Sequence, residues 1–146
     1  PLIDPAVIDH VARALDNNEM ATAATPLTDS ALLQSPTVVK VVTDLTGHAL
    51  YFSRSPIPHA REVPASGPGP IALRHLGLYG YRRDTLLRLV QWPPSPLEQI
   101  EKLEQLRALE NGLRIAVVRV QDEGIGVDTP ADVARVEALL ARASGR

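Results

Sequence analysis

The sequence contains no cysteine and few aromatic residues: one tryptophan, one phenylalanine and three tyrosines among 146 residues. Without cysteine it can form neither disulfides nor thiolate metal sites, a composition compatible with the cytoplasm. No apolar run approaches the roughly 20 residues that a membrane-spanning helix needs. The formal net charge of −2 gives no excess of basic residues for binding nucleic acid or an anionic membrane. We therefore expect a cytoplasmic protein with neither partner.

Two further features are missing from the sequence. It opens on Pro1-Leu2-Ile3-Asp4-Pro5 without an initiator methionine, so we expect it to be the later part of a longer protein. It also has no evident phosphate-binding loop. The glycine-containing stretch Gly67-Pro-Gly-Pro70 is unsuitable, because its prolines lack the backbone N–H donors with which such a loop holds phosphate.

The remaining pattern predicts one α/β domain with a mixed sheet and flanking helices. A length of 146 residues fits a single domain with its own core. Helices are expected at 5–16, 84–90, 95–110 and from Thr129 onward, and strands at 21–25, where Pro26 ends the strand, 37–42, 49–52, 74–81 and 113–120. The second and third strands form a hairpin, and the last is nearly all apolar, as in a buried and partly parallel sheet.

The strand at 74–81 carries polar groups on one face. With a side-chain period of two, His75, Tyr79 and Tyr81 share a face, with a gap at Gly77, and two leucines lie on the opposite, core-facing side. A small polar molecule could lie over the gap. The alternative is an ordinary polar outer face with a glycine bulge, and the strand taken alone favours that simpler interpretation.

The helix at 95–110 has a carboxylate in an unexpected place. Ser95 is a good N-cap, with Glu98 three residues later, as in a capping box. At about 100° per residue, Glu104 falls inside the arc formed by the apolar residues rather than on the polar side. A buried carboxylate is unfavourable unless it is paired or used. Two explanations stay open: a pair with Arg107 one turn along, or a role in a site.

An acidic residue, Asp128, follows the last predicted strand and two glycines and precedes a helix. Open α/β sheets place ligands at such strand ends, although an acid there can also serve only the turn. Asp122, Glu123 and Asp132 are rival acids. Asp132 is better explained as a partner of the helix cap, and the other two precede the glycines.

Several motifs in this order resemble the C-terminal part of the bacterial CMP-KDO synthetases, the 3-deoxy-manno-octulosonate cytidylyltransferases. Each motif is weak alone, but the ordered set is specific and extends over essentially the whole chain. The segments are Leu50-Tyr-Phe-Ser-Arg54, Arg74-His-Leu-Gly-Leu-Tyr-Gly-Tyr81, Pro94-Ser-Pro-Leu-Glu98, Leu103-Glu-Gln-Leu-Arg107 and Gly126-Val-Asp-Thr-Pro130.

The resemblance implies a Rossmann-like nucleotidyltransferase fold with a β-hairpin dimerisation region. It also implies a magnesium-dependent transfer of the cytidylyl group from CTP to the sugar acid KDO, for lipopolysaccharide synthesis, and usually a homodimer. Arg54 matches the arginine for the sugar carboxylate. The other matches are His75 and Tyr79 for the sugar, Glu104 and Gln105 for its hydroxyls, and Asp128 for magnesium.

The family's N-terminal phosphate-binding loop and its Gly-Asp-Glu-Pro metal segment have no counterpart here, and the loop at 58–70 diverges from the family. The resemblance therefore implies that residues 1–146 are the C-terminal part of a single cytidylyltransferase domain, with the nucleotide-binding part absent. Two alternatives stay open. The parent enzyme could use another sugar acid, as CMP-sialic acid synthetases do, or the chain could be a non-catalytic dimerising or sugar-binding fragment.

Overall fold

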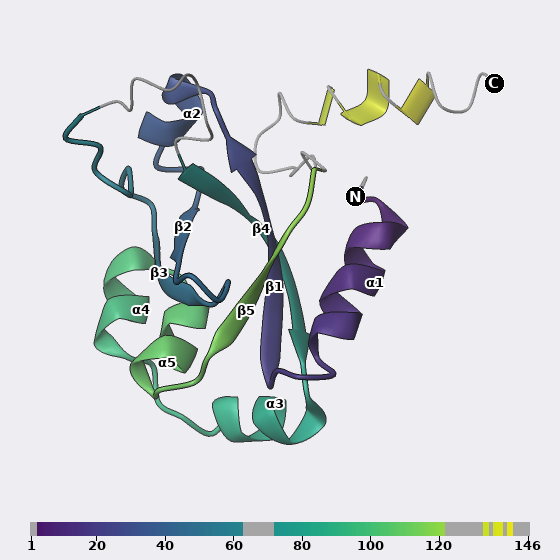
Figure 1. Cartoon of the computed structure of the whole chain (residues 1–146), viewed down its shortest axis with the longest axis vertical. Coiled ribbons are helices and arrows are strands. Elements are labelled where there is room, and N and C mark those ends of the chain that lie inside the picture. Colours follow the sequence, from purple (N-terminus) through teal and green to yellow (C-terminus); the bar gives the residue numbers. More distant parts are fainter. Residues whose placement is uncertain (1–2, 63–71, 122–132, 135, 139, 142–146) are drawn as a thin grey trace.

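The computed structural model describes residues 3–62 and 72–121, together with 133–134, 136–138 and 140–141 near the C-terminus. Its five strands form one mixed sheet in the order β3-β2-β4-β1-β5, with helices on both faces (Figure 1). The predicted α/β class is confirmed. The elements are α1 (Pro5–Ala14), β1 (Met20–Leu27), α2 (Ser30–Gln34), β2 (Lys40–Thr43), β3 (Ala49–Ser53), β4 (Ala72–Tyr81), α3 (Arg83–Leu89), α4 (Pro96–Glu101), α5 (Gln105–Glu110) and β5 (Ile115–Arg119).

The strand β1 lies between β4, to which it is antiparallel, and β5, to which it is parallel. The prediction that Pro26 ends this strand is wrong, because β1 continues to Leu27 and Pro26 lies opposite Leu73 of β4. The pairing with β5 covers only Met20–Ala24. Among the described residues, β1 at Pro26 therefore pairs with β4 but not with β5. Proline is tolerated at such edge positions, because its missing N–H is not needed for pairing.

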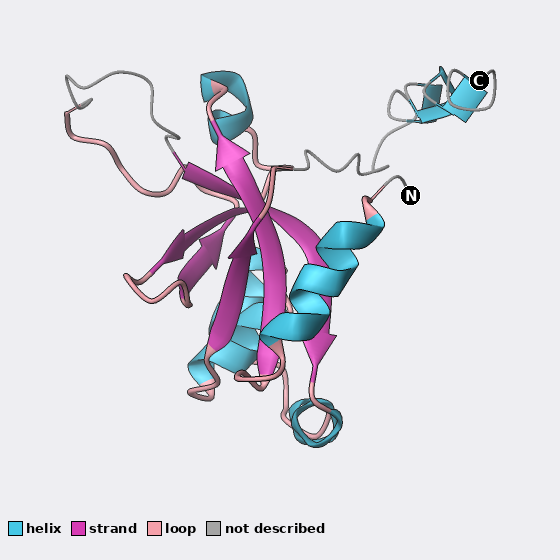
Figure 2. Ribbon diagram, turned by 45° about the vertical axis from the view of Figure 1, so that its right-hand side comes forward, coloured by secondary structure: helices cyan, strands magenta, loops and turns pink. Residues whose placement is uncertain are grey.

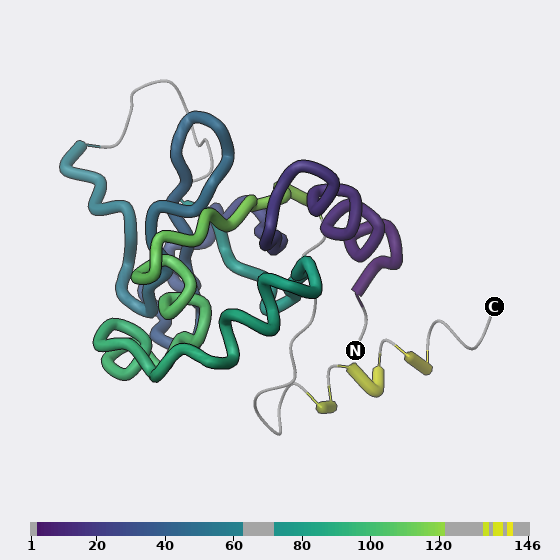
Figure 3. Tube along the Cα trace, turned by 90° about the horizontal axis from the view of Figure 1, so that it is seen from below, coloured from purple at the N-terminus to yellow at the C-terminus, as the bar shows by residue number. Residues whose placement is uncertain are grey.

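The helix α1 covers one face of the sheet, and α4 and α5 cover the other (Figures 2 and 3). Val7 and Val11 of α1 are buried against the β1–β4 face, whereas Ile8 of the same helix is 47% exposed. Gly80 permits this close approach, since a Cβ there would lie 3.1 Å from Val11 and Leu15 side-chain atoms. The larger core, between the sheet and α4–α5, is the one on which the candidate site rests.

The β2–β3 hairpin is confirmed, and it curves over that larger core. Its tip reaches the far strand: the Val117 N–H of β5 donates to the Gly47 carbonyl oxygen at 2.9 Å, and His48 bridges to Ala116. The hairpin is therefore held at two separate ends, one near α4 and one on β5.

The predicted continuous helix at 95–110 is wrong: α4 ends at Glu101, and α5 begins at Gln105. Lys102, between them, has a left-handed backbone with φ 56°. The guanidinium of Arg54 donates to the carbonyl oxygens of Glu101 and Lys102, and thus satisfies C-terminal carbonyls that a helix end leaves without partners. This contact from β3 is not visible in the local sequence.

The described residues include no helix with both the length and the apolar character needed to cross a bilayer. Near the C-terminus the described residues are helical, as expected, and Val136 is buried. The expected start of that helix at Thr129 lies outside the described residues.

Candidate functional site

The aromatic face of β4 is the centre of the site, and the predicted alignment is confirmed. The His75 ring lies 5.2 Å from the Tyr79 ring between centroids, and Tyr79 lies 6.0 Å from Tyr81. Phe52 of β3 packs edge-on against His75 at 5.0 Å. This face therefore packs on the larger core instead of forming a fully solvated outer surface.

The predicted irregularity at Gly77 is also present. The register of β4 on β1 shifts between the pairs Thr22–Tyr79 and Ala24–His75, so that three residues of β4 lie opposite one of β1. A Cβ built on Gly77 would have no atom within 4 Å. There is open space beside the Gly77 backbone, but the expected gap between the His75 and Tyr79 side chains is absent, because their rings lie in contact at 5.2 Å between centroids.

Burial controls the protonation of these side chains. It lowers the pKa of His75 to about 4, because the imidazolium form loses its hydration. Burial raises the pKa of Tyr79 and of Tyr81, and the nearby negative charge of Glu104 raises both further. At neutral pH this face consists of neutral hydrogen-bonding groups, with a carboxylate close by.

Arg54, just beyond β3, is anchored on the turn between α4 and α5. Its Nε donates to the Glu101 carbonyl oxygen at 2.9 Å, and its Nη1 to the Pro36 carbonyl oxygen at 3.1 Å. A weaker contact of 3.5 Å joins Nη2 to the Lys102 carbonyl oxygen. A guanidinium has five N–H donors, so two remain without a partner among the described residues. Those two can bind a carboxylate.

Lys40 is a residue that the sequence analysis did not single out. It is fully buried, and its ammonium donates to the carbonyl oxygens of Ser35, Val38 and Arg54, the first at 3.0 Å. Burial lowers the pKa of Lys40. The signal in the sequence was a single cation inside a run of β-branched residues, where an unpaired charge would be unfavourable.

The backbone of Arg54 is fixed on both sides. Lys40 binds its carbonyl oxygen, and the Glu101 carboxylate accepts its N–H at 3.0 Å and also the Ser53 hydroxyl. We call Lys40, Ser53, Arg54 and Glu101 the buried clamp. It joins the end of β3 to the end of α4 and fixes the backbone from which the Arg54 guanidinium extends.

The suggested pair between Glu104 and Arg107 is wrong. Arg107 binds the carboxylate of Glu98 through two nitrogens, Nε at 2.7 Å and Nη2. Because the helix breaks at Lys102, Glu104 does not lie on the packed face where a continuous helix would place it, and it is exposed. Its carboxylate is thereby free of the ion pair that would have given it a purely structural role.

Gln105, the next residue, is buried. Its side-chain Nε2 has no hydrogen-bond partner among the described residues. A buried amide without a partner is uncommon, since an unmade hydrogen bond there costs about 1–3 kcal/mol. A ligand oxygen at this position would satisfy it.

The structure thus connects the predicted site residues through the turn between α4 and α5. Arg54 is bound to this turn, Glu104 lies at its end and acts on Tyr79, and Tyr79 contacts His75. Gln105 follows directly in the chain. The predicted metal ligand, Asp128, lies outside the described residues, within which no cluster of three or more His, Asp or Glu side chains could hold a metal ion.

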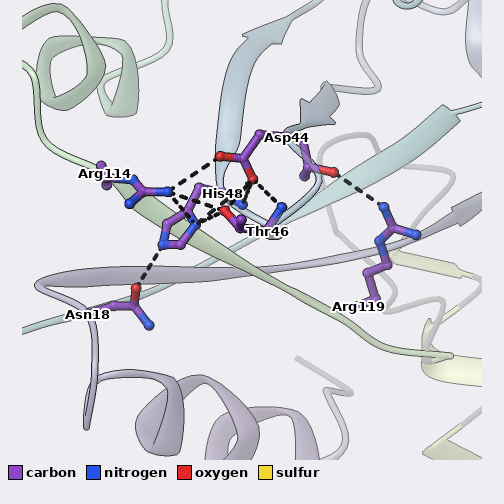
Figure 4. Close-up of polar contacts among 7 residues, drawn as sticks. Asn18, Asp44, Thr46, His48, Arg114 and Arg119 are labelled. Atoms are coloured by element: carbon purple, nitrogen blue, oxygen red, sulfur yellow. Dashed lines mark hydrogen bonds and ion pairs between the residues drawn. The ribbon is translucent and has the colours of Figure 1, made fainter.

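A second polar cluster lies at the hairpin tip (Figure 4). The Asp44 carboxylate accepts the N–H groups of Thr46 and His48, at 2.8 and 2.9 Å. His48 Nε2 lies 2.9 Å from the Asn18 amide oxygen, and Arg114 Nη2 lies 3.0 Å from His48 Nδ1. We call Asn18, Asp44, Thr46, His48 and Arg114 the tip cluster. Hydrogen bonds lower the pKa of Asp44 to about 2.

Comparison with known proteins identifies the family. A family model described as Cytidylyltransferase matches residues 1–115. The chain belongs to the cytidylyltransferase family. Among curated relatives, the chain is 52% identical over 148 residues to the 3-deoxy-manno-octulosonate cytidylyltransferase of Syntrophotalea carbinolica, covering 96% of the chain and 59% of the relative. It is 50% identical to the enzyme of that name from Geobacter sulfurreducens, covering 93% and 58%.

A solved structure of a related enzyme has the same fold as this chain. The CMP:2-keto-3-deoxy-manno-octonic acid synthetase complexed with CTP superimposes with a TM-score of 0.87 at 39% identity, covering 97% of this chain and 58% of the other. The chain therefore spans just under three fifths of the length of the relatives that it matches.

Proposed function

We propose that this chain carries the sugar-acid-binding part of an enzyme that transfers the cytidylyl group of CTP to the anomeric hydroxyl of KDO, giving CMP-KDO and pyrophosphate. The observation that carries the proposal is about 50% identity, over more than nine tenths of the chain, to relatives named for this reaction. The geometry supports it, because Arg54 has two available donors, and Phe52, two residues earlier in the chain, packs against the neutral ring of His75. KDO has one carboxylate, which a cation binds, and several hydroxyls, which neutral hydrogen-bonding groups bind.

In this proposal Arg54 binds the sugar carboxylate through the two N–H donors that the described residues leave available. His75 and Tyr79 line the sugar from β4. Glu104 and Gln105 bind its hydroxyls, one as a free carboxylate acceptor and the other as a buried amide donor that needs an acceptor. These groups bind and orient the nucleophile, which is most of what a protein contributes to nucleotidyl transfer.

We further propose that Mg²⁺ is the cofactor and that Asp128 is a ligand to it. Carboxylate and phosphate oxygens are the ligands that Mg²⁺ prefers, and the ion would neutralise charge on the phosphates of CTP. We expect Asp128→Asn to abolish turnover while leaving KDO binding intact, because it removes the charge and keeps the size. Near-normal turnover of this variant at limiting Mg²⁺ would rule out Asp128 as the ligand.

A cytoplasmic homodimer in lipopolysaccharide synthesis completes the proposal. The hairpin offers a surface for a second copy, since β3 is an edge strand of the described sheet. Leu50 on that strand is 62% exposed, and Leu45 at the hairpin tip is fully exposed. Exposed apolar side chains beside an unpaired strand edge favour association with another chain.

Pyrophosphate release from CTP tests the proposal in the full-length protein that contains this chain. We expect release that depends on both KDO and Mg²⁺, and none from residues 1–146 alone, which have no evident phosphate-binding loop. Release with N-acetylneuraminate in place of KDO would favour a CMP-sialic acid synthetase instead. No release with either sugar acid would favour a non-catalytic binding protein.

A further inference from the structure

The inference concerns Thr22, a fully buried residue of β1 opposite Tyr79. Its hydroxyl donates to the Leu78 carbonyl oxygen at 2.7 Å and lies 2.8 Å from Nε2 of His75. The carbonyl belongs to the segment of β4 where the register shifts, so neither β1 nor β2 pairs with residue 78. The Thr22 hydroxyl thus links two parts of β4 by hydrogen bonds: the Leu78 carbonyl oxygen in the segment where the register shifts, and the His75 ring.

A hydroxyl has a single proton to donate. Since Thr22 gives that proton to Leu78, it can only accept from His75, and Nε2 of His75 must carry a hydrogen. The reverse arrangement, with Thr22 donating to Nε2, would take this donor away from the Leu78 carbonyl oxygen. In a neutral imidazole with Nε2–H, the other nitrogen, Nδ1, is an acceptor. No described residue donates to Nδ1.

We propose that Thr22 is a positioning residue of the sugar site: it fixes the Nε2–H tautomer of His75, so that Nδ1 accepts a hydrogen bond from a hydroxyl of the bound sugar. This inference rests on the proposed function and deepens it, because it assigns His75 to a hydroxyl and not to the carboxylate. An anion has no proton to donate to Nδ1, whereas a sugar hydroxyl does.

Two further observations agree. Burial lowers the pKa of His75 to about 4, so the ring stays neutral at the pH of the cytoplasm and a cationic imidazole does not compete with Arg54 for the carboxylate. The Phe52 and Tyr79 rings pack against the imidazole, which restricts its rotation and keeps Nδ1 in one direction.

The first test is the tautomer itself, read from long-range proton–nitrogen NMR spectra of the full-length protein labelled with ¹⁵N-histidine. We expect His75 to be in the Nε2–H form in the wild type and in Thr22→Ser, which keeps the hydroxyl. Thr22→Val keeps the shape without the hydroxyl and should give a mixture that includes the Nδ1–H form. A wild-type His75 in the Nδ1–H form, or an unchanged spectrum in Thr22→Val, would overturn the inference.

The second test separates positioning from folding. Thr22→Val should raise the KM for KDO roughly fivefold to tenfold, the size of one lost neutral hydrogen bond, with little change in the KM for CTP. Thr22→Ser, which keeps the hydroxyl, should have the wild-type KM for KDO. Thr25→Val is the matched control, since Thr25 is a buried threonine of the same strand, and it should leave the KM for KDO unchanged.

The outcomes also distinguish this inference from the proposed function. Unchanged KDO kinetics in Thr22→Val, in an active enzyme, would overturn the positioning role and leave the function intact. An enzyme that does not use KDO would overturn the proposed function, while the NMR spectra would still report whether Thr22 sets the tautomer.

Discussion

Polar side chains hold both ends of the β2–β3 hairpin, but the two ends differ in burial. In the buried clamp, Lys40 and Ser53 are almost inaccessible to solvent. In the tip cluster, the Asp44 and Arg114 side chains are 32% and 66% exposed. Water competes for the hydrogen bonds of the exposed Asp44 and Arg114 side chains and cannot do so at Lys40. Similar groups therefore contribute very differently to stability.

The difference also concerns function. The buried clamp fixes the backbone of Arg54 from both sides, whereas the tip cluster joins the hairpin to β5, two strands away from β4 in the sheet. We expect changes in the clamp to affect stability and sugar binding together. Changes in the tip cluster should affect stability alone, and only slightly.

The largest effect is expected for Lys40→Met. Three carbonyl oxygens lose a charged donor inside the protein, and the free energy of unfolding should fall by about 3 kcal/mol or more. Urea denaturation measures the loss. Lys102→Met is the matched control, because Lys102 is exposed, and its effect should be far smaller. Equal losses for both variants would contradict the claim that the burial of Lys40 makes its hydrogen bonds important for stability.

The buried region should also show a pH dependence through His75. Its pKa is about 4 in the folded protein and 6.5 in the unfolded chain, so the unfolded state binds the extra proton first as the pH falls. Stability is therefore lost between pH 6.5 and pH 4, by about 3 kcal/mol at most. His75→Gln removes this contribution, and its free energy of unfolding should fall less over that interval. An identical slope in the two proteins would show that His75 is not buried as a neutral group.

A smaller effect is expected for Glu101→Gln in the clamp. The variant keeps the shape but weakens the acceptor for the Ser53 hydroxyl and the Arg54 N–H, at a cost of about 1–2 kcal/mol. Chemical denaturation gives the stability, and the KM for KDO should rise at the same time because Arg54 is less firmly held. A loss of stability with unchanged KDO kinetics would remove the clamp from the sugar site.

The smallest effect is expected for Asp44→Asn at the tip. Asp44 also accepts backbone N–H groups and a hydroxyl, but it does so in contact with water. Its pKa falls from 3.8 to about 2 on folding, so its contribution is present above pH 3.8 and is lost as the pH falls toward 2. Unfolding curves of the two proteins should converge over that interval. High salt should also reduce the difference, and a salt-independent difference larger than that of Glu101→Gln would reverse the comparison.

The features that the sequence predicted correctly depend on local periodicity. The alternation in β4 placed His75, Tyr79 and Tyr81 on one face, and the turn residues between two β-branched or aromatic runs predicted the hairpin. The packing then confirmed these assignments, because a period of two leaves no other face for the side chains.

The features that the sequence did not predict depend on contacts between distant segments. The break at Lys102 follows a helix end whose carbonyl oxygens Arg54 binds, and Arg54 lies 48 residues earlier in the chain. A helical wheel assumes an unbroken helix, so it placed Glu104 on the packed face and missed Glu98 as the partner of Arg107. Thr22 was missed because its partners, the Leu78 carbonyl oxygen and the His75 ring, lie on another strand. Lys40 was missed although two of its three carbonyl partners, Ser35 and Val38, are close in the sequence, because only the fold turns those carbonyl oxygens toward the ammonium.

The most direct test of the whole account is the effect of Arg54→Ala on the use of the two substrates by the full-length enzyme. Without the guanidinium the sugar carboxylate has no partner in a partly desolvated site, a loss of roughly 2–5 kcal/mol, so kcat/KM for KDO should fall by at least about 30-fold. CTP affinity, measured by direct binding, should change little, and Arg114→Ala at the tip should alter neither. Equal losses for KDO and CTP, or an unchanged kcat/KM for KDO, would contradict the assignment of this chain as the sugar-acid-binding part.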